Sequence, residues 1–557
     1  MTPDSAPAAV ALRPPSQVMQ LARMGSFHQC RLSFMRILLR RMKAENWRIE
    51  QRRFDIDGDG VGTALYTAHG PERSYTLVAF GHDLPDELRS DRVIAEAWDA
   101  TFTLYDGIPT DDDVERLRAN VPLQEAGRIS ESELTLARAN KSVRLFKYVV
   151  DCLAAGQQPD AEKVAEVGYL MRTTAVYGSG KFGAADRDVI AGRPECIAPF
   201  QVEMLTVYLI RCFVLDLVEH IAAAQSDRAV VLEPGLRRTF GIGNSTGLGM
   251  APFLLKHPML LNNWMAAREE ALARVRSVQT PTTEEIAAFQ DRVTRFVVSV
   301  GMWHSAHELQ VAKLTDLRAD LDELTKQLSG FDYANAPWDR LYLWGEANLS
   351  LEGQEALVAL MMEPYGHLVD GLSDCLGADE SLGHRIDGTQ TVAATRTLLR
   401  EFYGWAEEID WDAKPSQARA WYVSAEKLEP RLGERFDEPI AEYEQPLSPA
   451  RDAARLLDCL GEWDDAAPIA DLLIRHPEHR HTVRRLQLLD RCPYGEIRDN
   501  TIADTLLPID MLRCKLAFFG AGHFDPRSDR WVRINMFWGA PFPDDIATMR
   551  DDWNYPE

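Results

Sequence analysis

The chain has 557 residues, of which 46% are hydrophobic and 26% charged, and these are the proportions of an ordinary folded protein. Its formal net charge of −24 disfavours general binding to nucleic acid, because an acidic surface repels a phosphate backbone. At roughly 150 residues per domain the length favours about three or four domains, although helical enzymes often merge several into one body.

Cysteine usage and the apolar segments predict a cytoplasmic protein. No two of the eight cysteines have CxxC spacing, and no Cys/His cluster has zinc-ligand spacing, so we expect reduced thiols. The start of the chain lacks the basic and apolar regions of a signal peptide. The most apolar stretch, 199–224, carries Glu203, Arg211 and Asp216, which a lipid-spanning segment would not tolerate. We therefore expect no membrane partner.

The first part of the chain predicts a helix and a small sheet. Residues 1–15 read as a flexible tail, and 16–46 as one long helix with Leu and Met at helical spacing. Alternating segments within 47–107 then predict strands separated by DGDGVG and GPER turns. Residues 16–110 are thus expected to form a helix plus a small β-sheet unit.

The rest of the chain predicts mostly helix. A central helical domain with two glycine-rich loops is expected at 111–330, and a second helical region at 331–510. The last segment, 511–557, contains a predicted β-hairpin at about 515–539 and a tail. The predicted fold class is α+β, predominantly α: a large helical body with a small antiparallel or mixed sheet, to which the C-terminal hairpin is a candidate addition.

Two cations on a predicted helix at about 133–154 are the first candidate binding groups. At about 100° per residue, Arg138 falls within the apolar face of that helix and Lys141 at its edge. A buried cation requires a partner, so one interpretation is an internal ion pair with Glu125 or Glu203. The other is that both cations receive an anionic ligand.

The apolar helix predicted at 199–224 repeats this theme. Glu203 and Arg211 share one of its faces but lie two turns apart, too far to pair directly. Each then requires another buried partner, which predicts a polar network through the helical body. The network is either structural or part of a binding site.

The segment YGSGKFG at 177–183 fits GxGxxG, but a dinucleotide fold requires a strand before it and a helix directly after it. The preceding residues look helical, and the following stretch is short and polar, so we expect no nucleotide fold. A loop presenting Lys181, flanked by Arg172, Thr173 and Arg187, is expected, with backbone N–H groups available to an anion. The alternative is a helix-to-helix turn with a solvated lysine.

The loop GIGNSTGLGMAP at 241–252 is the most informative segment. Glycines surround Asn244, Ser245 and Thr246, and a helix is expected to begin near Pro252, where free N–H groups favour a carboxylate or phosphate. The alternative is a tight turn between helices packed through glycine. The spacing is not that of a P-loop.

This loop, with the LLKHP that follows, loosely resembles the serine-bearing flexible loop of the fumarase/aspartase superfamily. Those enzymes are helical bundles whose loop reads approximately Gly-Ser-Ser, then Met-Pro, then Lys and Asn. The resemblance implies that Ser245 matches the catalytic serine and Lys256 the substrate-carboxylate lysine. The spacing departs from the pattern, since extra residues separate Ser245 from Met250 and Ala251 splits Met250 from Pro252. What it implies is elimination or addition chemistry on a carboxylate.

Metal sites are not predicted. Asp55, Asp57 and Asp59 have calcium-loop spacing, but Tyr66 stands where a bidentate Glu belongs, so a hairpin turn is expected. The segment WHSAHEL at 303–309, with two His and one Glu, lacks the HExxH order of a zinc helix and is interpreted as a polar helix face.

The predicted function is that of an enzyme acting on a small anionic metabolite, carboxylate- or phosphate-bearing, with lyase-type chemistry as one candidate. The alternatives are a non-catalytic metabolite-binding protein and a structural or assembly protein whose buried cations form internal ion pairs. No cofactor is identified, and the expected partners are the anionic substrate and, as a candidate, a second copy in a homodimer. The predicted catalytic residues are Ser245, Thr246 and Lys181. The predicted substrate-binding residues are Arg128, Arg138, Lys141, Arg172, Thr173, Arg187, Glu203, Arg211 and Asn244.

Overall fold

The computed structural model divides the chain into two compact units. Unit 1 comprises Met1–Ser26, Gly247–Ala287 and Ala319–Cys514, and unit 2 comprises Phe27–Thr246, Ala288–Arg318 and Lys515–Glu557. The structure describes residues 10–88, 97–123, 129–173, 183–184, 187–190, 192–246, 258–304, 308–377, 385–412, 449–498, 508–520, 523–525 and 532–555.

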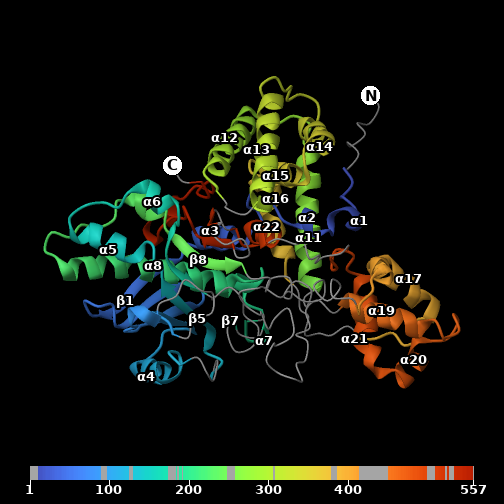
Figure 1. The fold of residues 1–557 in the computed structure, drawn as a ribbon, viewed down its shortest axis with the longest axis horizontal. Coiled ribbons are helices and arrows are strands. Elements are labelled where there is room, and N and C mark those ends of the chain that lie inside the picture. Colours follow the sequence, from blue (N-terminus) through green and yellow to red (C-terminus); the bar gives the residue numbers. More distant parts are fainter. Residues whose placement is uncertain are drawn as a thin grey trace. The chain divides into compact units, whose positions relative to one another are not determined.

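Within the described residues, unit 2 is built on one sheet of ten strands. Figure 1 labels several of them. The strands follow the order β1-β2-β3-β4-β5-β6-β8-β10-β9, and β7 pairs with β5 beside this path. Neighbouring strands are antiparallel except β6 and β8, which are parallel. The bounds are β1 Arg48–Ile56, β2 Gly62–His69, β3 Ser74–Gly81, β4 Ala100–Asp106, β5 Glu133–Lys141, β6 Tyr169–Thr173, β7 Gly183–Ala184, β8 Gly241–Thr246, β9 His523–Asp525 and β10 Val532–Met536.

The mixed sheet confirms the predicted fold class. The four strands expected within 47–107 are β1 to β4, and the expected C-terminal hairpin is β9 with β10. That hairpin joins the same sheet, because β10 pairs with β8. The calcium-like segment is a hairpin turn, as expected, in which Asp57 Oδ1 accepts hydrogen bonds from the N–H groups of Asp59 and Val61 at 3.0 and 2.8 Å.

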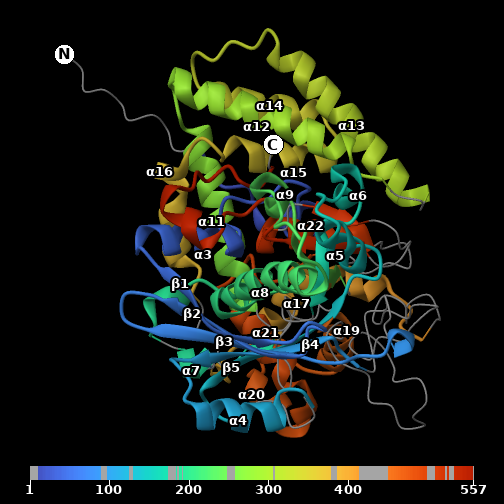
Figure 2. The same ribbon diagram turned by 90° about the vertical axis from the view of Figure 1, so that its left-hand side faces the viewer.

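Two helices of unlike character cover the two faces of the sheet (Figure 2). On one face lies α8, Gln201–Gln225, which is buried along most of its length. Its Phe213 contacts the rings of Phe54, Tyr66 and Phe102 at 5.6–6.5 Å between centroids. The opposite face carries the shorter α4, Asp111–Asn120, whose apolar stripe packs on a small cluster. The residues of that cluster are Leu65, Val78, Phe80, Val114, Leu117, Val121 and Leu136.

The remaining elements of unit 2 are α3 Phe34–Ala44, α5 Phe146–Ala154, α6 Ala161–Ala165, α7 Arg187–Ile190, α9 Pro234–Arg238 and the 3-10 turns η1 Asp86–Leu88, η2 Pro194–Cys196 and η6 Pro543–Thr548. Of these elements, α3, α5 and η2 contact α8. Three longer helices contribute residues to both units: α12 Thr283–Gly301, α13 Glu308–Leu328 and α22 Pro508–Phe519.

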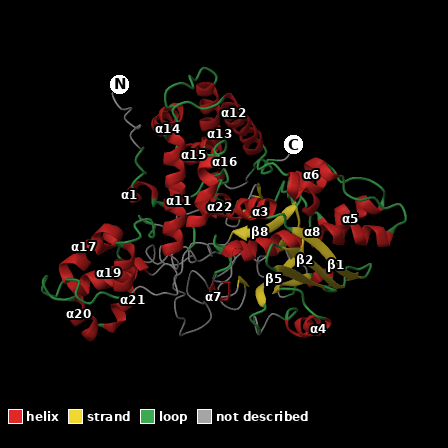
Figure 3. Cartoon of the chain, turned by 180° about the vertical axis from the view of Figure 1, so that it is seen from behind, coloured by secondary structure: helices red, strands yellow, loops and turns green. Residues whose placement is uncertain are grey.

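Within its described residues, unit 1 consists of helices without a sheet strand. One group contains α1 Pro15–Val18, α2 Leu21–Met24, α11 Pro258–Arg276, α14 Pro337–Asn348, α15 Leu351–Met361, α16 Gly366–Val369 and η3 Asp370–Cys375. A second group has its own apolar core and is drawn together in Figure 3. It contains α17 Val392–Tyr403, η4 Gly404–Glu408, α19 Pro449–Leu460, α20 Ile469–Arg475, η5 Pro477–His479 and α21 Arg480–Leu489.

The helix predicted over 16–46 is wrong, because three short helices, α1, α2 and α3, replace it. The helical stretch is interrupted at Gly25. A Cβ atom there would lie 2.5 Å from the backbone of Arg513, so only glycine permits this close approach. Arg13, which falls in the predicted flexible tail, is buried.

The helix predicted over 133–154 is also wrong in its first half, which is strand β5. Leu134 and Leu136 point to one face of β5, and Thr135 and Ala137 point to the other, which is the two-residue period of a strand. The segment before YGSGKFG is strand β6 and not helix, and GIGNST is strand β8 and not a turn. KLAFF, expected in the hairpin, belongs to α22.

No helix within the described residues is both long enough and apolar enough to cross a membrane. The helix expected near Pro252 lies outside the described residues, and α11 begins at Pro258.

Candidate functional site

The candidate site lies in unit 2, where the parallel strands β6 and β8 end side by side. Thr173, the last residue of β6, is the register partner of Asn244 on β8. The two are tied directly, because Asn244 Nδ2 donates a hydrogen bond to the Thr173 carbonyl at 2.8 Å. The described ends of the two strands that precede or begin the glycine-bearing segments are therefore neighbours in the sheet. In sheets with parallel strands, ligands bind outside such carboxyl ends.

On one side of β5, the neighbouring strand changes from β7 to β6 near Arg138. Ala139–Lys141 of β5 pair with β6, whereas Thr135 and Leu136 pair with β7. These two paired stretches leave Ala137 and Arg138 between them, and the Thr173 hydroxyl donates to the Arg138 carbonyl at 3.2 Å. Arg138 therefore lies beside Thr173, the last residue of β6.

Two arginines lie on the same sheet face at this point. Leu136, Arg138 and Asn140 are two residues apart along β5 and so share the face on which Leu136 packs against α4. Asn140 is the register partner of Arg172 on β6, which places Arg172 on that face too. The guanidinium carbon of Arg138 lies 4.1 Å from the ring centroid of Trp98, a cation–π contact that orients its plane. Arg172 is buried, with 9% of its surface exposed. The sheet therefore brings both arginines to adjacent strands.

A buried carboxylate supports the end of β5. Asp99 Oδ2 accepts a hydrogen bond from the Lys141 N–H at 2.9 Å, and Asp99 Oδ1 lies 3.9 Å from Lys141 Nζ. The Asn140 side chain accepts from the Asp99 N–H at 2.9 Å. Sequence reasoning missed Asp99 and Asn140, and the only available signal was that Asp99 stands two residues before Thr101, at the start of a strand expected within 47–107.

His82 borders the same group from the end of β3. Its Nε2 lies 2.8 Å from the Thr101 hydroxyl, and Thr101 is the register partner of Arg138. Burial lowers the pKa of His82, although the nearby Asp99 partly opposes this shift. A neutral His82 at pH 7 follows, able to donate or accept a hydrogen bond without adding charge. Sequence analysis did not select it.

Arg211 lies elsewhere, in the middle of α8, and its side chain donates hydrogen bonds to backbone carbonyl groups. Its guanidinium donates to the carbonyls of Phe240 at 2.7 Å, Ala540 at 3.0 Å and Pro541 at 3.4 Å. Burial lowers the pKa of Arg211 to about 10. These partners are the carbonyl before β8 and two carbonyls of the C-terminal segment, so Arg211 fastens both stretches to α8 and we assign it a structural role. Glu203, in the first turn of the same helix, is buried.

The other predicted residues are placed only in part. Arg128 and Lys181 lie outside the described residues, and Arg187 begins the short helix α7. Ser245 and Thr246 end β8, where their register partners on β10 are Arg533 and Val532. This strand position differs from the loop of a helical bundle that the fumarase/aspartase resemblance implies.

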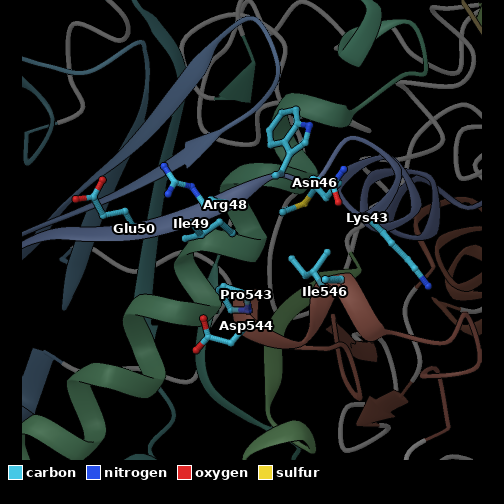
Figure 4. Close-up of a pocket in the computed structure, with 11 residues that line it drawn as sticks. Lys43, Asn46, Arg48, Ile49, Glu50, Pro543, Asp544 and Ile546 are labelled. Atoms are coloured by element: carbon cyan, nitrogen blue, oxygen red, sulfur yellow. The ribbon is translucent and has the colours of Figure 1, made fainter.

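A cavity of about 700 Å³ opens elsewhere in unit 2 and contains none of the predicted site residues (Figure 4). It lies between the end of α3, the start of β1 and η6. Its lining residues are Met42, Lys43, Asn46, Trp47, Arg48, Ile49, Glu50, Pro543, Asp544, Ile546 and Ala547. A second, smaller cavity of about 380 Å³ lies between α9 and the C-terminal segment.

Among the residues that the structure describes, no group of three or more His, Cys, Asp or Glu side chains is arranged to hold a metal ion. His304 is exposed, and His307 lies outside the described residues. Comparison with protein-family models, with curated protein sequences and with solved structures finds no match. Within the described residues, the fold and site define an α+β protein with a mixed sheet, in which Arg172 lies near the end of the parallel strand β6 and Arg138 lies on the neighbouring antiparallel strand β5.

Proposed function

We propose that this chain is an enzyme acting on a small anionic metabolite that unit 2 binds at the carboxyl ends of β6 and β8. The observation that carries the proposal is the register pairing of Thr173 with Asn244, which places the carboxyl ends of β6 and β8 side by side. Arg138 and Arg172 belong to the same sheet face beside those ends.

Charge and geometry both support an anionic ligand. A guanidinium group presents a planar fork of donors that matches a carboxylate or a phosphate. The chain carries a formal charge of −24, so two arginines gathered on adjacent strands contrast with the charge of the whole protein. Such a contrast concentrates a small anion at the site instead of over the surface.

Hydroxyl-bearing residues at the end of β8 support chemistry beyond binding. Ser245 and Thr246 follow Asn244 directly and are the proposed catalytic residues, together with Lys181. Elimination or addition next to a carboxylate is the reaction class that we propose to test first, because the sequence around Ser245 resembles the fumarase/aspartase loop even though Ser245 lies on a strand here. Unsaturated dicarboxylates and their hydrated or aminated counterparts are therefore the first substrates to assay.

Ligand-dependent stabilisation tests the binding half of the proposal. A ligand at about 100 times its Kd adds roughly 2.7 kcal/mol to stability, which a thermal-shift screen of carboxylates, phosphates and acyl-CoA esters detects easily. In Arg138→Gln and Arg172→Gln we expect this shift to be lost, because each removes a charged donor worth about 1.5–3 kcal/mol. The matched control is Arg118→Gln on α4, where the side chain is 42% exposed.

Turnover separates the enzyme from a binding protein. A folded Ser245→Ala variant that keeps ligand affinity but loses turnover supports the enzyme. An anion that binds without any conversion in the wild type favours the non-catalytic alternative. If no anion stabilises the wild type, the site is not an anion site, and the interpretation of the buried cations as structural ion pairs gains.

A further inference from the structure

The outer edge of β1 in unit 2 is open over nine residues. Within the described residues, Arg48–Ile56 pairs with β2 on one side and with no strand on the other. Most of its residues are exposed or half-buried, and only Ile56 is buried. Nine residues is long for a strand, whose usual length is about five or six, and an open edge presents unpaired N–H and C=O groups to another chain.

We propose that this edge binds β1 of a second copy of the chain, antiparallel, about a two-fold axis between Gln51 and Arg52. In that register Arg48 faces Asp55 of the second copy, and Glu50 faces Arg53. Ile49 faces Phe54. Two charged pairs then bring opposite charges together and Ile49 meets an apolar residue, which is the pattern that stabilises cross-strand pairs, while Arg52 faces the neutral Gln51. A two-fold axis makes every contact twice, as in most homodimers.

A bulge in β1 makes this register consistent with the faces of the sheet. The pairing with β2 shifts between Gln51 and Arg53, so Arg52 is an extra residue. Glu50 and Arg53 are therefore on one face even though their numbers differ by three. That face carries α4, because Arg53 pairs with Leu65 of the α4 cluster and its guanidinium lies 3.5 Å from Asp111. Without the bulge, residues with an odd separation would lie on opposite faces and could not pair directly.

The β1 residues on both sides of the bulge lie on the sheet faces that the proposed pairing requires. Before the bulge, Arg48 and Glu50 point to the face that carries α4, and after the bulge Arg53 and Asp55 point to the same face. Phe54 belongs to the other face, where its ring contacts Phe213 of α8. The charged pairs of the proposed interface therefore fall on one face, and the apolar pair falls on the other.

The cavity at the start of β1 supplies the second part of the interface. When the same antiparallel register is continued beyond Arg48, the turn Asp57–Asp59 of the second copy lies near Trp47 and Asn46. Both residues line the cavity shown in Figure 4. That turn is exposed and acidic, and the lining of the cavity offers it the cations Lys43 and Arg48 beside the carboxylates Glu50 and Asp544. A strand pair alone buries less than the roughly 1,200–2,000 Å² of a stable interface, so the docked turn adds the area that the strand lacks.

Charge reversal with rescue tests the proposed pairing on the full chain. Sedimentation of the wild type is expected to show a concentration-dependent species of twice the 62.8 kDa chain mass. Arg48→Glu places like charges opposite each other at both symmetric positions, so we expect Kd to rise about tenfold or more. The double variant Arg48→Glu/Asp55→Arg restores opposite charges and is expected to recover most of the affinity. Lys147→Glu, an exposed position on α5, is the matched control.

A disulfide test reports the register directly. Ile49→Cys combined with Phe54→Cys is expected to form a covalent dimer under mild oxidation. Within one chain the two positions are roughly 16 Å apart along an extended strand, too far for an internal disulfide. Ile49→Cys alone is the control for the natural cysteines, of which Cys375 is exposed. A wild type that stays monomeric, or a dimer indifferent to the charge reversal, overturns the proposal. It would mean that the charges and the bulge protect this edge from pairing.

Discussion

Asp551, near the end of the chain in unit 2, gathers three arginines around one carboxylate. Its oxygens lie 3.1 Å from Arg36 Nε, 2.9 Å from Arg40 Nη1 and 3.3 Å from Arg31 Nη2. Burial by itself raises the pKa of an aspartate, but here the three cations outweigh it and lower the pKa of Asp551 to about 2. The carboxylate is thus more acidic in the folded chain than in the unfolded one.

This depressed pKa predicts a loss of stability in acid. Since the folded carboxylate titrates near pH 2 and the unfolded one near 3.8, the stabilisation is complete above about pH 4 and is lost as the pH falls through 2. Its size is about 2 kcal/mol. In Asp551→Asn, the free energy of unfolding by urea is lower at neutral pH, and its gap from the wild type narrows between pH 4 and 2. A gap that stays constant over this range contradicts the assigned pKa. Asp151→Asn, on the surface of α5, is the control.

At the scale of elements, the parallel pairing of β6 with β8 depends on one small residue. A Cβ atom at Gly243 would lie 2.7 Å from the ring of Tyr169, closer than real Cβ atoms come to a neighbour. Gly243 is also the register partner of Arg172. The absence of a side chain at Gly243 therefore allows the ladder that positions the candidate site.

Gly243→Ala is expected to destabilise unit 2 by about 1–3 kcal/mol, because overpacking forces the Tyr169 ring or the strand to move. Anion affinity should fall with it, since the same ladder holds Arg172. Urea unfolding and ligand titration measure the two effects. Gly235→Ala on α9 is the control, because no atom lies within 4 Å of the added Cβ there. Equal stability of the two variants would show that Tyr169 yields without strain.

At the scale of the whole molecule, each unit holds its own buried ionic network. In unit 1, Arg13 donates to Glu269 at 2.7 Å and to Glu355 at 2.8 Å, and all three side chains are almost fully buried. Burial raises the pKa of Glu269, but Arg13 and Arg268 outweigh this and lower it. The segment before α1 is thereby fastened to α11 and α15 within the same unit.

Removing one member of each network tests whether the networks are independent. Arg13→Met leaves two buried carboxylates short of a partner and is expected to cost about 3–5 kcal/mol. Because Arg13 and Asp551 share no partner, the effects of Arg13→Met and Asp551→Asn should add within about 0.5 kcal/mol in the double variant. Calorimetric unfolding of the four proteins measures this. A larger deviation shows that the two networks are coupled.

The sequence by itself determined the local elements whose pattern does not depend on distant partners. β1 to β4 and the C-terminal hairpin were predictable because alternation and turn residues lie within each segment. The central position of α8 followed from its almost continuous apolar composition. The acidic net charge also follows from the sequence alone, and it disfavours general binding to nucleic acid.

Only the tertiary structure decided which segments become neighbours. The stretch of β5 around Arg138 has apolar residues compatible with either period, and its pairing with β4 and β6 selects the strand. The break at Gly25 depends on Arg513, almost five hundred residues away. The site itself arises from the pairing of Thr173 with Asn244, two residues far apart in the chain. Such contacts form between segments, so no pattern within one segment could specify them.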